Sequence, residues 1–428
     1  MKIELHKNTP RELDVLRRLA VEQNVPLFLV GGALRDHLSG RPVADFDFAV
    51  AAGGEELPRN FARRIGGSCF WLDQGRGQCR IVLKHGSDIL TFDFAPLCGA
   101  SIEEDLASRD FTVNAMAIDV SKCLLIDPLS GLTDLHSRTL RSCSSSAFTS
   151  DPLRLLRAFR LAATLGFKIE DHTRAAIGDH AGLITLVASE RIRDELFKIL
   201  EGQHAECSFT ELRAAGLLAP LFPGGKDLNR GIAFLGRIEG ALANPEEVLP
   251  ELGPLLSGYL KEQLEGGVTT RSMLKLASFL KGADGEGSAD KLCKKIRLGR
   301  KALRMLQHLL EGFDEQVVWL DSNPGIRSMY RFFQDKLRGP EAVLFAQAHH
   351  GLSDGVSRRL LSFYFTEYQD QEELLSGQEI MQAFALAEGE EVGWAIAGLR
   401  AAERTGTVVT REEAIEFLQR KLLTKDLS

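Results

Sequence analysis

The sequence lacks a hydrophobic run long enough to cross a membrane. A membrane-spanning helix needs about 20 mainly apolar residues, and no stretch of the 428-residue chain has that character. The first residues, MKIELHKNTPRELDVL, also lack the apolar core of a secretory signal peptide. We therefore predict a cytoplasmic protein that has no membrane partner.

Cysteine is scarce, and its spacing excludes two common kinds of site. The seven cysteines are an odd number, scattered along the chain without a CxxC pair. Disulfide frameworks need paired cysteines, and zinc sites need closely spaced ones. The sequence therefore predicts reduced thiols, as expected in the cytoplasm.

An excess of positive charge is missing too. Lysine and arginine number 52 against 59 acidic residues, which gives a formal net charge of −7. Domains that bind nucleic acid usually carry a basic patch or stripe. A nucleic-acid partner of this chain would therefore have to be held by local basic patches.

Strand patterns are confined to the first part of the chain. Up to about residue 145, segments such as PLFLVGG, DFDFAV and DILTFDFAP have the composition of strands. After the polar segment SCSSSAFTS, the apolar spacing is typical of one helix after another. Because single cores rarely exceed roughly 250–300 residues, we predict an α+β head with a mixed sheet, followed by an elongated all-α remainder.

Two short segments place carboxylates on one face of predicted strands. Asp45 and Asp47 alternate with phenylalanines in DFDFAV, and Asp93 does the same in TFDFAP. Because alternate residues of a strand share a face, the three carboxylates converge if these strands are neighbours. Divalent ions that need oxygen ligands suit such a cluster, so we predict a Mg²⁺ site there. The alternatives are a basic partner, or three acids that are simply solvated at the edge of a sheet.

The stretch VGGALRD has the features of a phosphate-binding turn. A strand that ends in Gly31 and Gly32 and continues as a helix leaves backbone N–H groups available to a phosphate. Such turns are also common without a ligand. Further on, Arg109 could bind a phosphate, while Asp110 or Asn114 could hydrogen-bond a ribose hydroxyl. The alternative there is a surface ion pair at a helix end.

The segment DPLRLLRAFR predicts a helix that begins at Pro152 and is capped by Ser150 or Asp151. Asp151 and Arg154 would share a face of its first turn. A carboxylate beside a guanidinium there could match the hydrogen-bonding edge of a nucleobase. Two further basic residues of the helix could meet a triphosphate, Arg157 and Arg160. The alternative is a capped surface helix with an internal salt bridge.

Five segments in a fixed order resemble a known family. They are LVGGALRDHLSGRPVADFDF, EEDLASRDFTVNAMAID, DPLSGLTDL, DPLRLLRAFR and SERIRDEL, spread over residues 29–196. In this order they resemble the class II tRNA nucleotidyltransferases, a family that includes CCA-adding enzymes and bacterial poly(A) polymerases. The resemblance implies a polymerase-β-like nucleotidyltransferase fold for the head.

The resemblance also implies roles for the motif residues. The catalytic, Mg²⁺-binding carboxylates would be Asp45, Asp47 and Asp93. The residues that contact triphosphate and ribose would be Gly31, Gly32, Arg35, Arg109, Asp110 and Asn114. The pair that recognises the base of CTP or ATP would be Asp151 and Arg154.

The implied reaction needs no protein nucleophile. The 3′ hydroxyl of a tRNA would attack the α-phosphate of CTP, assisted by two Mg²⁺ ions. In this family, a flexible loop of about a dozen or more residues before the EEDL segment is associated with the switch from CTP to ATP. Here only FAPLCGASI separates Asp93 from Glu103. The sequence therefore favours addition of CC, with a separate A-adding enzyme acting afterwards.

The helical remainder is predicted to divide further. We predict a catalytic head over 1–148, a base-recognising neck over 149–212, a body over 213–340 and a tRNA-binding tail over 341–428. Relatives often carry a His-Asp phosphohydrolase site in the body. This chain has Lys281 and Gly282 at that place, so we predict no such activity.

Basic residues gather in KLCKKIRLGRKALR, residues 291–304. The segment contains no acid, so it predicts a basic helical face that could follow the phosphates of tRNA. The alternative is a solvated basic helix. The predicted RNA contacts are Lys294, Lys295, Arg297, Arg300, Lys301 and Arg304.

Three functions remain open from the sequence. The first is addition of CC to tRNA. The second keeps the chemistry and changes the product to full CCA, to a terminal A, or to poly(A), with ATP as a substrate. The third is a catalytically silent RNA-binding scaffold. The intact Asp45, Asp47 and Asp151–Arg154 pair favour the enzyme over the scaffold.

Overall fold

The computed structural model describes most of the chain. The described residues are 10–86, 88–284, 296–310, 317, 320, 325–334, 339–368, 374–387, 389–404 and 407–425. Contacts divide the protein into two compact units, Met1–Val187 with Ala214–Leu221, and Ala188–Arg213 with Phe222–Ser428. None of the helices within these described ranges is both long and apolar enough to cross a membrane.

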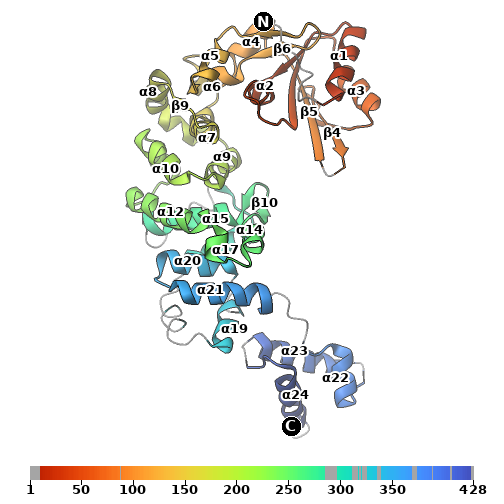
Figure 1. The fold of residues 1–428 in the computed structure, drawn as a ribbon, viewed down its shortest axis with the longest axis vertical. Helices are drawn as coiled ribbons and strands as arrows, with labels where there is room; N and C mark the ends of the chain where they lie inside the picture. The colour runs from red at the N-terminus through yellow and green to blue at the C-terminus, as the bar shows by residue number, and fades with distance from the viewer. Residues whose placement is uncertain are drawn as a thin grey trace. The chain divides into compact units, whose positions relative to one another are not determined.

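A seven-stranded sheet organises the first unit (Figure 1). Its strands are β1 (Leu27–Val30), β2 (Asp45–Val50), β3 (Ser68–Asp73), β4 (Gln78–His85), β5 (Asp88–Pro96), β6 (Ala117–Asp119) and β7 (Leu124–Ile126). They lie in the order β3-β4-β5-β2-β1-β6-β7. β2 and β5 run parallel, and the other neighbouring pairs of this sheet run antiparallel. The sheet is therefore mixed, as predicted.

Helices and two short strands complete the first unit. They are α1 (Glu12–Glu22), α2 (Gly31–Leu38), α3 (Leu57–Ile65), α4 (Ile102–Ala107), η1 (Thr112–Asn114), α5 (Gly131–His136), β8 (Thr139–Leu140), α6 (Ala147–Ser150), α7 (Arg154–Leu165), β9 (Lys168–Ile169), α8 (Asp171–His180), η2 (Ala181–Leu186) and α11 (Leu218–Leu221). Figure 1 shows α1 and α3 next to each other beside the strands.

Phenylalanines determine which face of the sheet is buried. Phe46 and Phe48 of β2 stack on Phe92 and Phe94 of β5, with ring centroids 5.6 and 5.1 Å apart. Phe61 of α3 meets the edge of the Phe92 ring at 5.2 Å. Because side chains alternate along a strand, burying these rings turns the aspartates of β2 and β5 to the opposite face.

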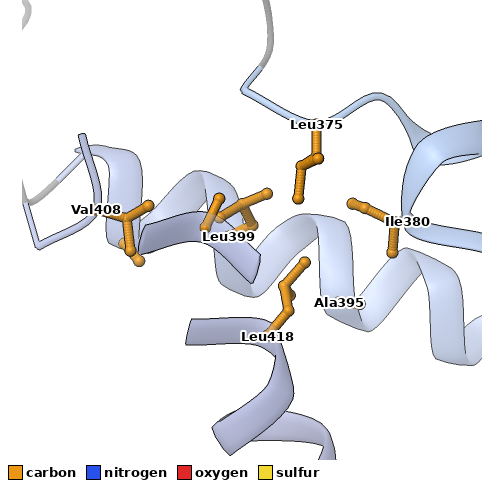
Figure 2. Packing of buried hydrophobic residues seen from close by; sticks show 8 residues of the cluster. Leu375, Ile380, Ala395, Leu399, Val408 and Leu418 are labelled. Atoms are coloured by element: carbon orange, nitrogen blue, oxygen red, sulfur yellow. The ribbon is translucent and has the colours of Figure 1, made fainter. Parts of the chain in front are cut away.

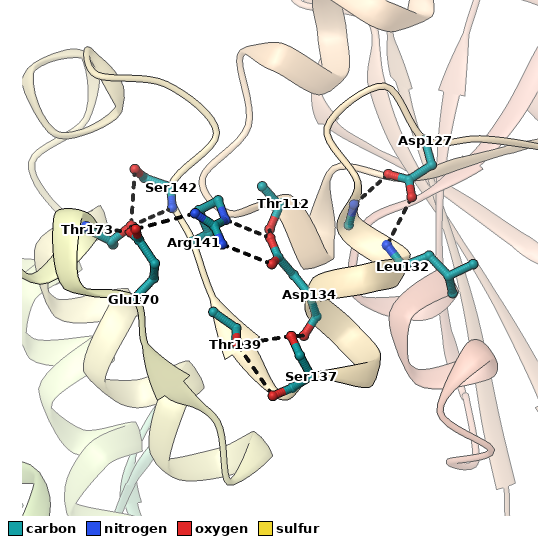
Figure 3. Close-up of polar contacts among 11 residues, drawn as sticks. Thr112, Asp127, Leu132, Asp134, Ser137, Thr139, Arg141, Ser142, Glu170 and Thr173 are labelled. Carbon is teal, nitrogen blue, oxygen red and sulfur yellow. Dashed lines mark hydrogen bonds and ion pairs between the residues drawn. The ribbon is translucent and has the colours of Figure 1, made fainter.

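The segment DPLSGLTDL anchors the η1 turn (Figure 3). Gly131 and Leu132 donate backbone N–H groups to Asp127 at 2.6 and 3.0 Å. Thr112 Oγ1 donates to Asp134 at 2.7 Å. A Cβ on Gly131 would lie 2.2 Å from the Thr112 carbonyl oxygen, so this close approach of α5 requires glycine. The segment therefore positions η1 and, with it, the residues of the next motif.

Arg141 carries this network to the following helix. Its Nε donates to Asp134 at 3.1 Å, and its Nη1 lies 3.3 Å from Glu170. Glu170 in turn accepts from the Thr173 backbone N–H at 2.8 Å and so caps α8 (Figure 3). One arginine thus links α5 to α8.

Within its described residues, the second unit is helical apart from one hairpin. Its helices are α9 (Ser189–Glu201), α10 (Ala205–Ala214, whose last residue belongs to the first unit), α12 (Leu228–Ala243), α13 (Pro245–Val248), α14 (Gly253–Leu260), α15 (Thr270–Asp284), α17 (Arg300–Leu310), α19 (Ile326–Gln334), α20 (Pro340–His349), α21 (Asp354–Phe363), η4 (Tyr364–Tyr368), α22 (Gly377–Phe384), α23 (Glu390–Arg404) and α24 (Arg411–Lys425). The strands β10 (Gln263–Glu265) and β11 (Val268–Thr269) form a hairpin that the sequence did not predict.

A buried ion pair joins four helices of this unit. Lys275 of α15 is 1% exposed, and its Nζ donates to the Gly202 carbonyl at 2.6 Å and to Glu239 of α12 at 2.7 Å. Glu239 also accepts the backbone N–H groups of Ala205 and Glu206 at the start of α10. The pair therefore provides hydrogen-bond partners for a backbone carbonyl at the end of α9 and for backbone N–H groups at the beginning of α10.

The C-terminal helices share an apolar core (Figure 2). It comprises Leu375, Ile380, Ala395, Leu399, Ala402, Val408, Ala414 and Leu418. Ser376 caps α22 by accepting from the Glu379 backbone N–H at 3.3 Å, while Glu379 accepts from the Ser376 N–H at 2.8 Å. This reciprocal cap explains why the helix begins at the LSGQE segment.

Candidate active site

Three aspartates meet on the open face of the sheet. Asp45 and Asp47 lie on β2, and the register places Asp93 of β5 directly beside Asp47. The condition for convergence, that the two strands are neighbours, is therefore met. Thr91, two pairs along and directly beside Asp45, donates its hydroxyl to Asp45.

The three carboxylates influence one another. The pKa of Asp47 is raised to about 6, first because surrounding protein atoms displace water from it, and then because Asp93 and Asp45 are negative. Arg109 and Arg80 oppose that rise. A raised carboxylate pKa in a cluster of acids is typical of a site that awaits a cation.

Arg80 is a residue that the sequence did not single out. It lies on β4 opposite Asp93, and its Nε and Nη2 donate to the two oxygens of that carboxylate at 2.8 and 2.7 Å. Alternation in CRIVLKH places it on the same face as the acids once β4 is known to pair with β5. The pairing itself is not visible in the sequence, so this neighbour could not have been named.

The donor set fits a divalent ion that is completed by substrate. Within the described ranges, no three His, Cys, Asp or Glu side chains are already arranged around a metal position. Mg²⁺ is commonly bound by one or two carboxylates together with substrate phosphates, without a complete protein cage. Asp45 and Asp47, on one face and mutually repelling, provide such a partial set.

The Gly31–Gly32 turn lies directly over the acids. Gly31 has φ +73, and a Cβ there would be 3.2 Å from Asp47 Oδ2 and 3.5 Å from Arg109 Nη1. Only glycine adopts this backbone conformation without strain. The start of α2 is thus brought to the carboxylates, as a phosphate-binding turn requires.

Arg35 is turned into the protein. It is 8% exposed, and its Nη1 donates to Asn114 Oδ1 at 2.7 Å while its Nη2 meets Asp36 at 2.7 Å. The structure therefore shows Arg35 bracing α2 against η1. The predicted triphosphate contact would need this side chain to leave those partners.

Asp110 is the centre of a buried network. Arg157 donates to its Oδ2 through Nε and Nη2 at 3.0 and 2.8 Å, and Asn114 and the Phe111 N–H donate to its Oδ1 at 3.1 and 2.8 Å. Burial alone would raise the pKa of Asp110, but these donors, Arg157 foremost, lower it. The network connects α7 to η1, and through Asn114 to α2.

The helix of the DPLRLLRAFR segment begins later than predicted. α7 starts at Arg154, and residues 147–150 form the separate turn α6, so the prediction of a start at Pro152 was wrong. Asp151 nevertheless accepts from the Leu153 N–H at 3.2 Å, which is the contact expected of the predicted capping residue. A capped turn before the helix leaves Asp151 in an extended conformation beside α7.

Arg154 ties α7 to the loop after α4. Its Nη2 donates to the Ser108 carbonyl at 2.7 Å and its Nη1 to the Arg109 carbonyl at 3.1 Å. Arg109 itself pairs with Asp105 at 2.7 Å. Arg160 lies half-exposed further along α7. The structure thus brings the predicted ribose and base residues onto adjoining segments of one unit.

The predicted RNA contacts are only partly within the described residues. Lys294 and Lys295 lie outside them. Arg297 pairs with Glu190 of the SERIRDEL helix, and its carbonyl accepts from Arg193 at 3.2 Å. Three exposed residues on or at the start of α17 remain, Arg300, Lys301 and Arg304.

The place of the His-Asp site is closely packed. Gly282 lies on α15 where a Cβ would be 2.6 Å from the Arg230 carbonyl oxygen and 2.7 Å from Gly231 Cα. An aspartate there would force α12 and α15 apart. Gly282 therefore permits a tight contact between α12 and α15, and the lack of phosphohydrolase activity stays a prediction.

Comparison with known proteins places these features in context. A family model described as "Poly A polymerase head domain" matches residues 27–141, and one described as "Probable RNA and SrmB- binding site of polymerase A" matches residues 166–228. The chain is 39% identical over 419 residues to the CC-adding tRNA nucleotidyltransferase of Geobacter sulfurreducens, which covers 96% of this chain and 95% of that protein.

Other similar proteins add different product names. The A-adding tRNA nucleotidyltransferase of Deinococcus radiodurans is 30% identical over 423 residues, covering 92% of this chain and 94% of that protein. The solved structure of the Thermotoga maritima CCA-adding enzyme complexed with tRNA has a TM-score of 0.67 at 25% identity, and covers 98% of this chain and 97% of that one. The predicted fold class is confirmed by this likeness.

Proposed function

This chain belongs to the family of tRNA nucleotidyltransferases and poly(A) polymerases, and on that basis we propose that it transfers CMP from CTP to the 3′ end of tRNA to build the CC sequence. Membership makes it a nucleotidyltransferase that releases pyrophosphate. The number and identity of the added nucleotides, and the use of Mg²⁺, belong to the proposal.

The observation that carries the CC proposal is a short connection. β5 ends at Pro96 and α4 begins at Ile102, so residues 97–101 are the whole link between the third aspartate's strand and the EEDL helix. The family associates a longer flexible loop here with the change from CTP to ATP. The CC-adding relative at 39% identity supports the same product, whereas the A-adding relative at 30% identity is the reason for a direct test.

The proposed chemistry uses the open face of the sheet. The 3′ hydroxyl oxygen of the tRNA would form a bond to the α-phosphorus of CTP, the bond from that phosphorus to the pyrophosphate oxygen would break, and the hydroxyl proton would pass to solvent. Mg²⁺ held by Asp45 and Asp47, with Asp93 beside them in the grip of Arg80, would lower the pKa of the hydroxyl and offset the charge of the leaving pyrophosphate.

The chain's own residues would position the nucleotide. The backbone of Gly31 and Gly32, above Asp47, would meet the triphosphate. Arg109 lies beside the same carboxylate and would bind a phosphate oxygen. The ribose would be met by Asp110 and Asn114, and the base by Asp151 and Arg154. Arg160 would meet the triphosphate, and Arg35 and Arg157 would do so on leaving their present partners.

The predicted division of the chain follows from this assignment. The head over 1–148 would carry catalysis, the neck over 149–212 base recognition, and the tail over 341–428 tRNA binding, with the body over 213–340 lacking phosphohydrolase chemistry. A separate A-adding enzyme would complete the tRNA in the cytoplasm. Arg300, Lys301 and Arg304 are the described basic residues proposed to contact RNA.

A primer-extension assay tests the proposal. The protein is incubated with Mg²⁺ and a tRNA transcript that lacks its CCA end, with CTP, ATP or both, and products are sized to one nucleotide. Two additions with CTP, and no third with ATP, are expected. Asp45→Asn provides the matched inactive control.

Each other outcome points to a different product or class. A third addition with ATP would identify full CCA synthesis, and addition of A to a CC-ended transcript alone would identify an A-adding enzyme. Long tails on unstructured RNA would identify a poly(A) polymerase. Binding of tRNA without any transfer would revive the silent scaffold.

A further inference from the structure

A single row of side chains crosses the open face of the sheet. The register pairs Phe70 of β3 with Arg80 of β4, Arg80 with Asp93 of β5, and Asp93 with Asp47 of β2. Residues directly opposite on neighbouring strands point to the same face. With strands about 4.8 Å apart, the Phe70 backbone lies about 10 Å from that of Asp93.

Apolar side chains are exposed on this face beside the acids. Phe70 is 54% exposed, and Leu72, at the register shift that follows in β3, is 55% exposed. Ile89, on the Asp93 face of β5, is 52% exposed. Trp71 alternates to the other face, where Arg59 lies over its ring at 5.2 Å. The other aromatic side chains of β3 and β5 lie on the face that the helices cover. The exposed ring of Phe70 is therefore the aromatic group that these strands present on the catalytic face.

Cations accompany the apolar side chains. Arg80 stands between Phe70 and Asp93 and remains 45% exposed although it grips the carboxylate. Lys84, on the same face of β4, is exposed. An aromatic ring next to arginine and lysine is the combination that holds single-stranded nucleic acid, because bases stack on the ring and phosphates meet the cations.

We propose that Phe70 and Arg80 receive the 3′-terminal nucleotide of the acceptor RNA, with its base stacked on Phe70 and its phosphate facing Arg80, so that the 3′ hydroxyl reaches Asp93. This inference rests on the proposed function, since it assumes an RNA acceptor. A partner bound permanently over the row would cover the aspartates at its other end. A substrate that enters and leaves is therefore the occupant that the geometry favours.

Arg80 has a second, positioning part in this arrangement. Its two N–H groups fix both oxygens of Asp93, so the carboxylate nearest the incoming hydroxyl is oriented before RNA arrives. Lysine keeps the charge but cannot make the same two-pronged contact. Arg80→Lys is expected to lower kcat while it leaves the KM for CTP within about 2-fold, a change too small to reflect lost binding energy.

The decisive variant is Phe70→Ala. Loss of one stacked base is expected to raise the KM for CCA-less tRNA roughly 5- to 150-fold, with the KM for CTP unchanged. Phe70→Tyr keeps the ring and should restore the wild-type KM. Val21→Ala removes a side chain on α1 that is 56% exposed, and it should change neither constant. Equal thermal midpoints for the variants would show that the fold is intact.

Two results would overturn the inference. One is a Phe70→Ala enzyme whose KM for tRNA equals that of the wild type. The other is a Phe70-dependent dimer in sedimentation, which would make the face a subunit interface.

Failure of this inference can be told from failure of the proposed function. If the wild-type protein transfers no nucleotide at all, the proposed function fails. If the wild-type protein transfers nucleotide and Phe70→Ala is unaffected, only the present inference fails. A tRNA with a terminal 4-thiouridine should, in addition, cross-link within residues 68–73.

Discussion

The aspartates on the open face show how single residues create the chemistry. Asp47 is squeezed between Asp45, Asp93 and the Gly31 turn, and burial together with the repulsion raises its pKa to about 6. Burial and neighbouring negative charges both make the ionised form of Asp47 unfavourable, so this cluster lowers the stability of the folded protein. Neutral side chains at these positions would avoid that electrostatic cost. The cluster is therefore better explained by a bound cation than by stability.

Metal binding is expected to weaken as the pH falls through about 6. Below the raised pKa of Asp47 the carboxyl is protonated and cannot ligate, so a proton must leave before Mg²⁺ binds. The Mg²⁺ concentration for half-maximal CMP transfer should be nearly constant above this pH and rise about tenfold for each unit below it. A flat dependence across this range would contradict a role for Asp47 in holding the metal.

Gly31→Ala is expected to lower kcat by more than its loss of folding stability can explain. A left-handed backbone costs about 1–2 kcal/mol for a residue with a Cβ, and the new methyl would press on Asp47 at 3.2 Å. Measuring kcat together with urea unfolding separates the two effects. Gly40→Ala is the matched control, since Gly40 has φ +69 and an added methyl there would have no neighbouring atom within 4 Å; it should lose stability alone. Equal activity losses in both variants would contradict the argument.

At the scale of elements, the polar network around Asp110 sets the geometry of the site. α7, η1 and α2 are joined through Arg157, Asp110, Asn114 and Arg35. The bonds that join these elements do not follow the chain locally, since Arg157 and Asp110 are 47 residues apart and Arg35 and Asn114 are 79 apart. The motifs that the sequence separates are thus one structural assembly.

Arg157→Ala is expected to destabilise the protein by about 3 kcal/mol at neutral pH, because it leaves the buried Asp110 charge without its main partner. The pKa of Asp110 is lowered in the folded state, so its stabilising contribution is present above the ordinary carboxyl pKa of about 4 and is lost as the pH falls through the folded value. Urea unfolding should therefore show the two proteins converging in acid. Arg157→Lys should lose less, and a variant as stable as wild type at neutral pH would contradict the prediction.

How much of this could be predicted depends on the kind of pattern. Alternation in DFDFAV was sufficient to place Asp45 and Asp47 on one face of a strand, because strand periodicity is local. That Asp93 joins them depends on the pairing of β2 with β5, which the sequence left as a condition. Arg80 and Phe70 could not be found in the same way, since their importance depends on which strands pair and in what register. The start of α7 was misplaced by two residues, because Asp151 caps the chain at the Leu153 N–H while regular helix begins only at Arg154.

At the scale of the whole molecule, the residues proposed to bind the nucleotide and the C-terminal helices belong to different compact units. All residues proposed to contact the nucleotide lie in the first unit, Met1–Val187 with Ala214–Leu221. The helices α22, α23 and α24 of the second unit have an apolar core that is distinct from the sheet (Figure 2). A role for the tail in holding RNA can therefore be tested without altering the catalytic face.

Deletion of residues 374–428 is expected to raise the KM for tRNA at least about tenfold, which corresponds to about 1.4 kcal/mol of binding, and to leave the KM for CTP unchanged. The reason is that the deletion removes the tail core and no residue of the nucleotide site. Leu399→Ala in the full chain is the companion variant. Leu399 is 2% exposed, and its truncation costs about 2–5 kcal/mol in a packed core, so it should reproduce the KM defect as the tail unfolds. If the shortened protein binds tRNA as tightly as the full chain, the tail does not contribute to tRNA binding. The next residues to test would then be Arg300, Lys301 and Arg304 on α17.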